Sequence, residues 1–219
     1  MTEIKDLLDL SHTIAADLFK NRIYPWEVLD DIKDFILKLG ETLSPEEFDH
    51  PSDGIWIARD ATIFPSAYIG APCIIDHGAE VRHCAFIRGS AIVGKNSVVG
   101  NSCELKNVVL FDNVQTPHYN YVGDSILGYR SHMGAGSITS NVKSDKTLVV
   151  VKAPDGSVET GHKKFGAILG DFVEVGCNSV LNPGTVVGRN SNIYPTSCVR
   201  GVIPANSIFK DKDSIVSKE

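Results

Sequence analysis

The chain has 219 residues with 27 acidic and 21 basic side chains, which give a formal net charge of −6 at pH 7. This acidic balance argues against a nucleic-acid partner, because nucleic acids bind basic surfaces. No apolar run is long enough to span a membrane, and the acidic N-terminal residues lack signal-peptide character. The five cysteines have no paired spacing, which indicates a reducing compartment. We therefore predict a cytoplasmic protein with neither a nucleic-acid nor a membrane partner.

Residues 1–50 carry 12 acids and 5 bases and have the pattern of two helices. Apolar residues recur over residues 2–20 without a regular stripe. Over residues 25–40 Pro25 suits a first turn, apolar residues follow at helical spacing, and Gly40 ends the helix. We interpret residues 1–50 as an N-terminal helical cap over the open end of the β structure that follows. The alternative is a module for subunit contact or substrate specificity.

A large apolar residue returns at every sixth position from Ile57 to Val199, with two interruptions. The positions are Ile57, Ile63, Ile69, Ile75, Val81, Ile87, Val93, Val99, Leu105, Phe111, Leu127, Met133, Leu169, Val175, Leu181, Val187, Ile193 and Val199. Four places after most of them stands a small residue. This period fits neither a helix nor a long strand, and it predicts short strands joined by corners. We therefore predict an all-β solenoid, a parallel β-helix of hexapeptide repeats, over residues 51–209.

Three hexapeptides would close one turn, so residues 18 apart should lie above one another at a strand spacing of about 4.8 Å. Residues 142–165 interrupt the repeats, and we predict that they form a projecting β-hairpin with a turn at Pro154-Asp155-Gly156. Loops that interrupt a repeat array usually lie over its binding face. The charged residues 210–219 are predicted to form a loose tail.

Arg88 and Lys106 each follow an inward apolar residue of the repeat, and they are 18 residues apart. They should therefore point outward in one column, one turn apart. Stacked cations repel each other unless an anion lies close to both. The pair is a candidate phosphate clamp, because guanidinium and ammonium groups are strong phosphate donors. The alternative is two solvated surface bases.

The repeat breaks over residues 116–121, where Pro117 stands at the position of the apolar residue and His118 follows. A histidine presented by a turn is a candidate general base, because its unperturbed pKa of about 6.5 lies close to neutrality. The alternative is a histidine that only packs in the turn. The residue type alone does not separate the two interpretations.

Three motifs carry a family resemblance: Glu104-Leu105-Lys106, residues 118–124 (His-Tyr-Asn-Tyr-Val-Gly-Asp) and residues 134–141 (Gly-Ala-Gly-Ser-Ile-Thr-Ser-Asn). With these motifs and their spacing, the segment from Arg88 to Val199 resembles the acetyltransferase domain of the bifunctional N-acetylglucosamine-1-phosphate uridylyltransferase/glucosamine-1-phosphate acetyltransferase. It also resembles the C-terminal domains of archaeal sugar-1-phosphate nucleotidylyltransferases. The resemblance implies that the β-helix is left-handed and that the protein is a homotrimer with sites between subunits.

The resemblance also assigns roles by position. It implies that the sugar phosphate is bound by Arg88, Lys106, Tyr121, Asn141 and Lys164, with Lys164 reaching a neighbouring subunit. His118 falls on the family's catalytic base, and Cys177 and Pro195 fall where the family contacts acetyl-CoA. The sequence departs from the family at Val142, where the family has tyrosine, at Cys177, where it has serine, and at Arg130, where it has asparagine.

These assignments predict an acetyl-CoA-dependent N-acetyltransferase that acts on an amino-sugar 1-phosphate, with glucosamine 1-phosphate as the acceptor in UDP-N-acetylglucosamine biosynthesis. The chain has no Gly-rich nucleotidyltransferase loop, so we expect no uridylyl transfer. One alternative, favoured by Val142 and Cys177, is a non-catalytic sugar-phosphate-binding or regulatory subunit. A second is a metalloenzyme of the γ-carbonic-anhydrase type, but His83 and His118 lack a third histidine at a suitable spacing, and we predict no metal site.

Overall fold

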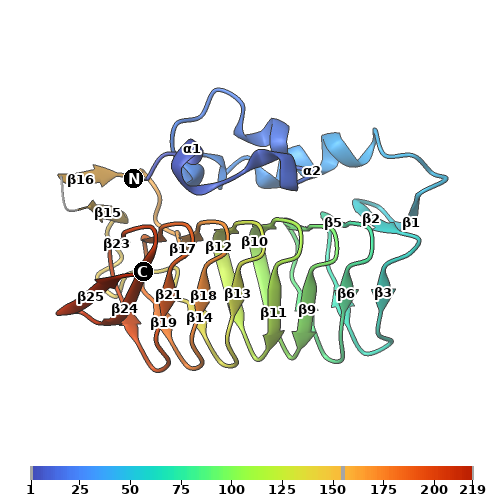
Figure 1. Cartoon of the computed structure of the whole chain (residues 1–219). Coiled ribbons are helices and arrows are strands. Elements are labelled where there is room, and N and C mark those ends of the chain that lie inside the picture. The colour runs from blue at the N-terminus through green and yellow to red at the C-terminus, as the bar shows by residue number, and fades with distance from the viewer. Residues whose placement is uncertain (1, 154–155, 219) are drawn as a thin grey trace.

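The computed structural model describes residues 2–153 and 156–218, and it is a parallel β-solenoid with a helical segment along one side (Figure 1). The strands stack in three columns. The first column holds β4 (Tyr68–Ile69), β7 (Phe86–Ile87), the first part of β10 (Glu104–Leu110) and of β12 (Tyr121–Leu127), β14 (Ile138–Thr139), β19 (Val180–Leu181) and β22 (Cys198–Val199). The predicted all-β solenoid is confirmed, and its left hand stays a prediction from the resemblance.

The other two columns complete each turn. The second holds β2 (Ile55–Ala58), β5 (Cys73–Ile75), β8 (Ala91–Val93), the second part of β10 and β12, β17 (Ala167–Leu169), β20 (Thr185–Val187) and β23 (Val202–Ile203). The third holds β3 (Thr62–Ile63), β6 (Glu80–Val81), β9 (Val98–Asn101), β11 (Gln115–His118), β13 (His132–Met133), β18 (Glu174–Val175), β21 (Asn192–Ile193) and β24 (Ser207–Asp211).

The predicted 18-residue step holds in the first turns, where Ile57 pairs with Ile75 and Ile75 with Val93. It then shortens to 17, because Val93 pairs with Leu110 rather than with Phe111. The reason lies at the corner between the first and second columns. Three residues, 88–90, separate β7 from β8, whereas only two separate Leu105 from Val108 in β10. The predicted register was therefore wrong at Phe111, although Phe111 is fully buried. It is correct again where the repeat resumes, because Leu127 pairs with Leu169 and Met133 with Val175.

The helical segment before β1 (Phe48–Ser52) contains α1 (Ile4–Leu7), η1 (Leu10–His12), η2 (Ala16–Phe19), η3 (Pro25–Val28) and α2 (Ile32–Gly40). It lies along the second column rather than over the end of the coil, so the predicted end cap is wrong (Figure 1). α2 packs against β5, β8 and β10, and η3 packs against β12. At the end of the coil itself, β1 pairs antiparallel with β2.

An apolar stripe on the second column explains this position. Neighbouring residues of a strand point to opposite faces, yet both members of each aliphatic pair in this column are buried. The outer members of the pairs, all fully buried, are Ile74, Ile92, Val109, Ile126, Ile168 and Val186. In the first column the corresponding outer residues Tyr68 and Phe86 are 61% and 42% exposed. The amphipathic helices therefore cover the second column, whose outer residues are aliphatic and buried.

Two predicted local elements differ in outcome. The interruption of the repeats forms the predicted hairpin, with β15 (Val150–Ala153) antiparallel to β16 (Gly156–Glu159). Pro154 and Asp155, the first residues of its predicted turn, lie outside the described residues. The predicted loose tail is wrong, because β25 (Ser214–Ser217) pairs antiparallel with β24. No helix in the described part of the chain is long and apolar enough to cross a membrane.

Replacing Ile92 by alanine tests the stripe. Ile92 is fully buried where α2 packs on β8, so Ile92→Ala should lower the free energy of unfolding by about 2–5 kcal/mol. The matched control is Ile215→Ala, at a site that is 42% exposed, which should cost less than about 1 kcal/mol. Urea unfolding of the two variants measures both values. Equal losses would contradict the covering role of the helices.

Candidate functional site

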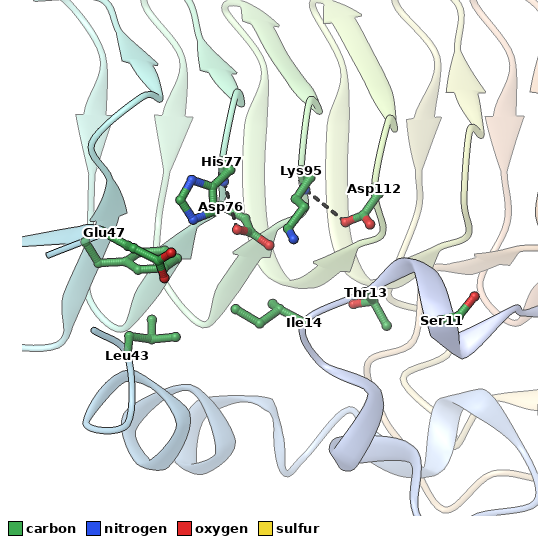
Figure 2. A pocket seen from close by; sticks show the side chains of 10 residues that line it. Ser11, Thr13, Ile14, Leu43, Glu47, Asp76, His77, Lys95 and Asp112 are labelled. Atoms are coloured by element: carbon green, nitrogen blue, oxygen red, sulfur yellow. Dashed lines mark hydrogen bonds between the residues drawn. The ribbon is translucent and has the colours of Figure 1, made fainter. Parts of the chain in front are cut away.

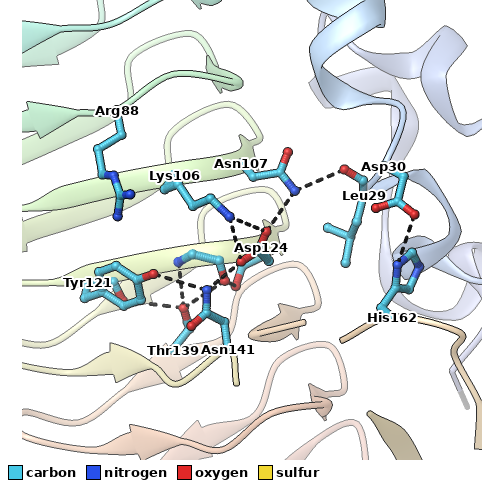
Figure 3. Close-up of polar contacts among 12 residues, drawn as sticks. Leu29, Asp30, Arg88, Lys106, Asn107, Tyr121, Asp124, Thr139, Asn141 and His162 are labelled. Carbon is cyan, nitrogen blue, oxygen red and sulfur yellow. Dashed lines mark hydrogen bonds and ion pairs between the residues drawn. The ribbon is translucent and has the colours of Figure 1, made fainter. Parts of the chain in front are cut away.

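Arg88 and Lys106 lie one turn apart in the first column, as the sequence predicted. Ile87 pairs with Leu105, which places the residues that follow them side by side. Each cation already has an acidic partner. Figure 3 shows the pairing of Lys106 with Asp124. Arg88 Nη1 lies 2.8 Å from Glu104 Oε1, and Lys106 Nζ donates to both oxygens of Asp124 at 3.0 and 3.2 Å. Carboxylates of the protein therefore supply the anions that the stacked cations require.

Asp124 is the centre of this cluster, a role that was not predicted from the sequence. Its side chain is 5% exposed, and besides Lys106 it accepts hydrogen bonds from Asn107 Nδ2 at 3.1 Å and from Asn141 Nδ2 (Figure 3). Asn141 Nδ2 also donates to Tyr121 Oη at 3.1 Å. A signal was present in the sequence, because Asp124 stands 18 residues after Lys106 and ends one of the motifs.

The corner that carries Asp124 is tight. Asn107 and Asp124 adopt left-handed φ values of 55° and 49°, which asparagine and aspartate tolerate better than most residues. A Cβ atom on Gly123 would lie 2.5 Å from Tyr121 Oη, so a larger residue there would displace the phenol. Burial, followed by the negative charges of Asp124 and Glu104, raises the pKa of Tyr121. Tyr121 therefore keeps its proton at neutral pH and can act as a hydrogen-bond donor.

His118, Cys177 and Pro195 share the corner at the opposite edge of the first column. Gly136 N donates to His118 O, Asn178 N to Ala135 O and Thr196 N to Cys177 O, so these corners stack turn upon turn. Asn120 is buried and fixes the His118 corner, since its Oδ1 accepts from His118 N at 3.1 Å and its Nδ2 donates to Gly134 O at 2.9 Å. The His118 ring is exposed and makes no hydrogen bond to any residue that the structure describes.

Lys164 lies on the same side of the molecule as Lys106. Both line a pocket of about 680 Å³ that also contains Leu29, Lys33, Asn107, Asp124 and residues 161–163. Its walls come from the helical segment, from the β-helix corners and from the end of the interruption at residues 142–165, which we call the excursion. The structure thus brings Arg88, Lys106, Tyr121, Asn141 and Lys164 to one region. It places His118, Cys177 and Pro195 along the other edge of the first column, with β12 running between the two groups.

A smaller pocket of about 260 Å³ lies on the other side of the helical segment and contains none of the predicted site residues (Figure 2). Asp76 and Asp112 line it together with Lys95, facing Thr13 and Ile14. Asp76 is fully buried, and its Oδ2 has no hydrogen-bond partner among the described residues. Burial raises the pKa of Asp76, against the opposing effects of the His77 N–H and the Lys95 charge.

Residues 69–216 match the family model described as the GMPPB C-terminal domain. The chain belongs to this family. The resemblance stated from the motifs is confirmed by curated relatives. The bifunctional protein GlmU of Methanococcus maripaludis (strain C5) is 33% identical over 218 residues, which cover 97% of this chain and 53% of the relative. The bifunctional sugar-1-phosphate nucleotidylyltransferase/acetyltransferase of Sulfurisphaera tokodaii is 30% identical over 189 residues, 85% of this chain and 47% of the relative.

This GMPPB C-terminal-domain chain therefore spans about half the length of the curated relatives that it matches. Among solved structures, the acetyltransferase domain of PglB from Neisseria gonorrhoeae FA1090 covers 80% of the chain and 74% of its own, with 17% identity and a TM-score of 0.32. No group of three or more His, Cys, Asp or Glu side chains within the described residues is placed to hold a metal ion.

Replacing Asp124 by asparagine tests its central role. Asp124→Asn preserves the left-handed corner but leaves the donors of Lys106, Asn107 and Asn141 without a carboxylate, so the free energy of unfolding should fall by about 1–3 kcal/mol. The control is Glu104→Gln, which removes the 34% exposed partner of Arg88 and should cost less than about 1 kcal/mol. Urea unfolding at neutral pH measures both. An Asp124 variant as stable as the control would show that the cluster does not depend on this carboxylate.

The Asp76 carboxyl should give stability a distinct pH dependence. Its pKa is raised in the folded state, so its ionisation at neutral pH opposes folding, and this penalty disappears as the pH falls below both pKa values. Asp76→Asn should therefore be more stable than the parent at neutral pH, and the difference should shrink towards about pH 4. Chemical unfolding at the two pH values measures this. A variant that is less stable than the parent at neutral pH would contradict the prediction.

Proposed function

We propose that the chain is an acetyl-CoA-dependent N-acetyltransferase that acts on an amino-sugar 1-phosphate, with glucosamine 1-phosphate as the acceptor. The observation that carries the proposal is the layout of the first column. A polar cluster of Arg88, Lys106, Tyr121 and Asn141 lies at one edge, and the exposed His118 lies at the other. The names of the curated relatives, GlmU and a sugar-1-phosphate nucleotidylyltransferase/acetyltransferase, support the same chemistry.

The acceptor binds with its phosphate towards Arg88, Lys106 and Lys164, where charge-assisted hydrogen bonds replace part of the pairing with Glu104 and Asp124. Tyr121 and Asn141 already contact each other, so the ring hydroxyls of the sugar meet groups of fixed geometry. The amine of the acceptor then points along the column towards His118. This orientation supplies a large share of the rate enhancement, because it removes the entropic cost of bringing the amine to the thioester.

The reaction is an acyl transfer. The neutral amine attacks the thioester carbonyl carbon, the C–N bond forms, and the C–S bond breaks. His118 accepts the proton that the nitrogen loses, and the CoA sulfur leaves and takes up a proton as the thiol. An imidazole suits this step because it changes charge between about pH 5 and 8. Backbone N–H groups near Cys177 stabilise the negative charge on the carbonyl oxygen.

The chain offers chemistry that fits acetyl-CoA. Pro195 lines a pocket of about 510 Å³ near the C-terminal end of the coil, together with Arg200, Phe209 and Lys210. Cations beside an aromatic and apolar wall suit the phosphates and the adenine of CoA. This pocket lies beyond Cys177 along the same stacked corner as His118. Acetyl-CoA bound there extends along the corner and presents its thioester at His118.

The proposal includes the homotrimer and the UDP-N-acetylglucosamine pathway that the resemblance implies. The helical segment already covers the second column, so the first and third columns remain for contact with other subunits. Lys164 lines the pocket of its own chain, and a role in a neighbour's site would require it to bridge two subunits. The competing proposal is a non-catalytic sugar-phosphate-binding subunit. It is favoured by the ion pairs that already satisfy Arg88 and Lys106.

Removing the His118 imidazole separates the two proposals. His118→Ala should lower kcat by about 10²- to 10⁴-fold and leave the affinity for the acceptor nearly unchanged, because the base acts in the transition state. The assay is thiol release from acetyl-CoA against a panel of hexosamine 1-phosphates. His83→Ala is the matched control, because His83 is also exposed and lies away from the first-column cluster, bonded to Ser66. If His118→Ala acetylates as fast as the control, His118 is a packing residue and not the base. If neither the parent nor the variants release thiol, the binding-subunit proposal takes precedence.

A further inference from the structure

The pocket of about 680 Å³ beside Asp124 has an excess of positive charge. Its lining includes four lysines, Lys33, Lys106, Lys163 and Lys164, and two aspartates, Asp30 and Asp124. Lys106 is paired with Asp124, and Asp30 lies 3.4 Å from the ring of His162. Among the described residues, Lys33, Lys163 and Lys164 form no ion pair. The pocket lining is therefore positively charged, although the whole chain carries a net charge of −6.

The wall that carries Lys33 is held against the β-helix by three contacts. Asn107 Nδ2 donates to Leu29 O at 3.0 Å, and Asp30 pairs with His162. The Trp26 and Phe165 rings pack with their centroids 5.7 Å apart. Each contact joins the helical segment to a β-helix corner or to the end of the excursion. Lys33 and Lys163 therefore line the same pocket, and the three contacts fix the positions of the backbone segments that carry them.

We propose that Lys33 and Lys163, together with Lys106 and Lys164, bind the anionic group of the acceptor. This inference rests on the proposed function and assigns part of its phosphate site to the helical segment. A phosphate monoester carries about −1.5 to −2 charges at pH 7, which matches the excess of two positive charges in the lining. Uncompensated ammonium groups that share one pocket repel each other, and a dianion between them relieves this repulsion.

Two ligands of the proposed reaction carry phosphate, and the position of the pocket favours the acceptor. The pocket contains Asn107 and Asp124, which belong to the polar cluster of the first column. Cys177 and Pro195, the residues assigned to acetyl-CoA, lie along the other edge of that column. The part of β12 between them, from Tyr121 to Asp124, spans about 10 Å in an extended chain. The lysines and the residues assigned to acetyl-CoA therefore lie at opposite edges of the first column, and only the lysines share a pocket with the polar cluster.

The test compares two variants with a matched control in the full-length chain. Lys33→Ala and Lys163→Ala should each raise KM for a hexosamine 1-phosphate about 10-fold, with a smaller change in kcat, because each removes a charge-assisted contact. The rise in KM should be absent for the unphosphorylated hexosamine and should weaken with added salt. It should not appear in Lys33→Arg, which keeps the positive charge. Lys38→Ala removes an exposed lysine from the same helix without touching the pocket, and should behave as the parent.

Two results would overturn the inference while leaving the enzyme proposal intact. One is an unchanged KM for the phosphorylated acceptor in both alanine variants, and the other is a raised KM for acetyl-CoA alone. If the parent acetylates no hexosamine phosphate, the proposed function fails, and binding of inorganic phosphate by equilibrium dialysis tests the site by itself. Weaker phosphate binding by Lys33→Ala than by Lys38→Ala would then support it, and equal binding would reject it.

Discussion

Side chains on neighbouring turns of a parallel β-helix lie about 4.8 Å apart, and the candidate site depends on how the chain satisfies that spacing. Arg88 and Lys106 stack in this way and would repel each other. Glu104 and Asp124 lie beside them and neutralise both. Both carboxylates therefore already stabilise the β-helix before any ligand binds. An acceptor phosphate that binds there must displace part of an existing network, so its net gain is smaller than two free cations would provide.

The corner between the first and second columns concentrates the unusual features of the chain. Residues 88–90 form a corner of three, and the next two corners, Lys106-Asn107 and Gly123-Asp124, contain only two residues. The shorter corner turns β10 and β12 into continuous seven-residue strands and draws Asp124 beneath Lys106. One turn further on, the excursion leaves the coil at the same corner and returns at Gly166. The change in repeat length thus coincides with the candidate site.

The six-residue period was sufficient to predict the solenoid, the pairing of Ile57 with Ile75 and the column of Arg88 and Lys106. These follow from local spacing, which a regular coil converts directly into contacts. Asp124 and the 17-residue step were not predicted, because the corner of β10 is one residue shorter than the repeat requires. The sequence pattern hides this, since Phe111 still places an apolar side chain at the expected position. The position of the helices was predicted wrongly because a helical segment can cover either the open end of the β-helix or an apolar outer face of one column. The paired aliphatic residues of the second column, Ile74-Ile75 and Ile92-Val93, were the signal that distinguishes them.

The helical segment contributes both to stability and to the candidate site, so its cover of the second column and the alternative role as a specificity module do not exclude each other. Its apolar face buries the stripe of the second column, which fixes the direction in which its polar face points. That polar face carries Asp30 and Lys33 at the edge where the short corners and the excursion meet. The burial that stabilises the coil therefore also positions the pocket wall. A sequence change under the helices would alter the pocket beside Asp124 even though it touches no residue there, because Asn107 is bonded to both Asp124 and the Leu29 carbonyl.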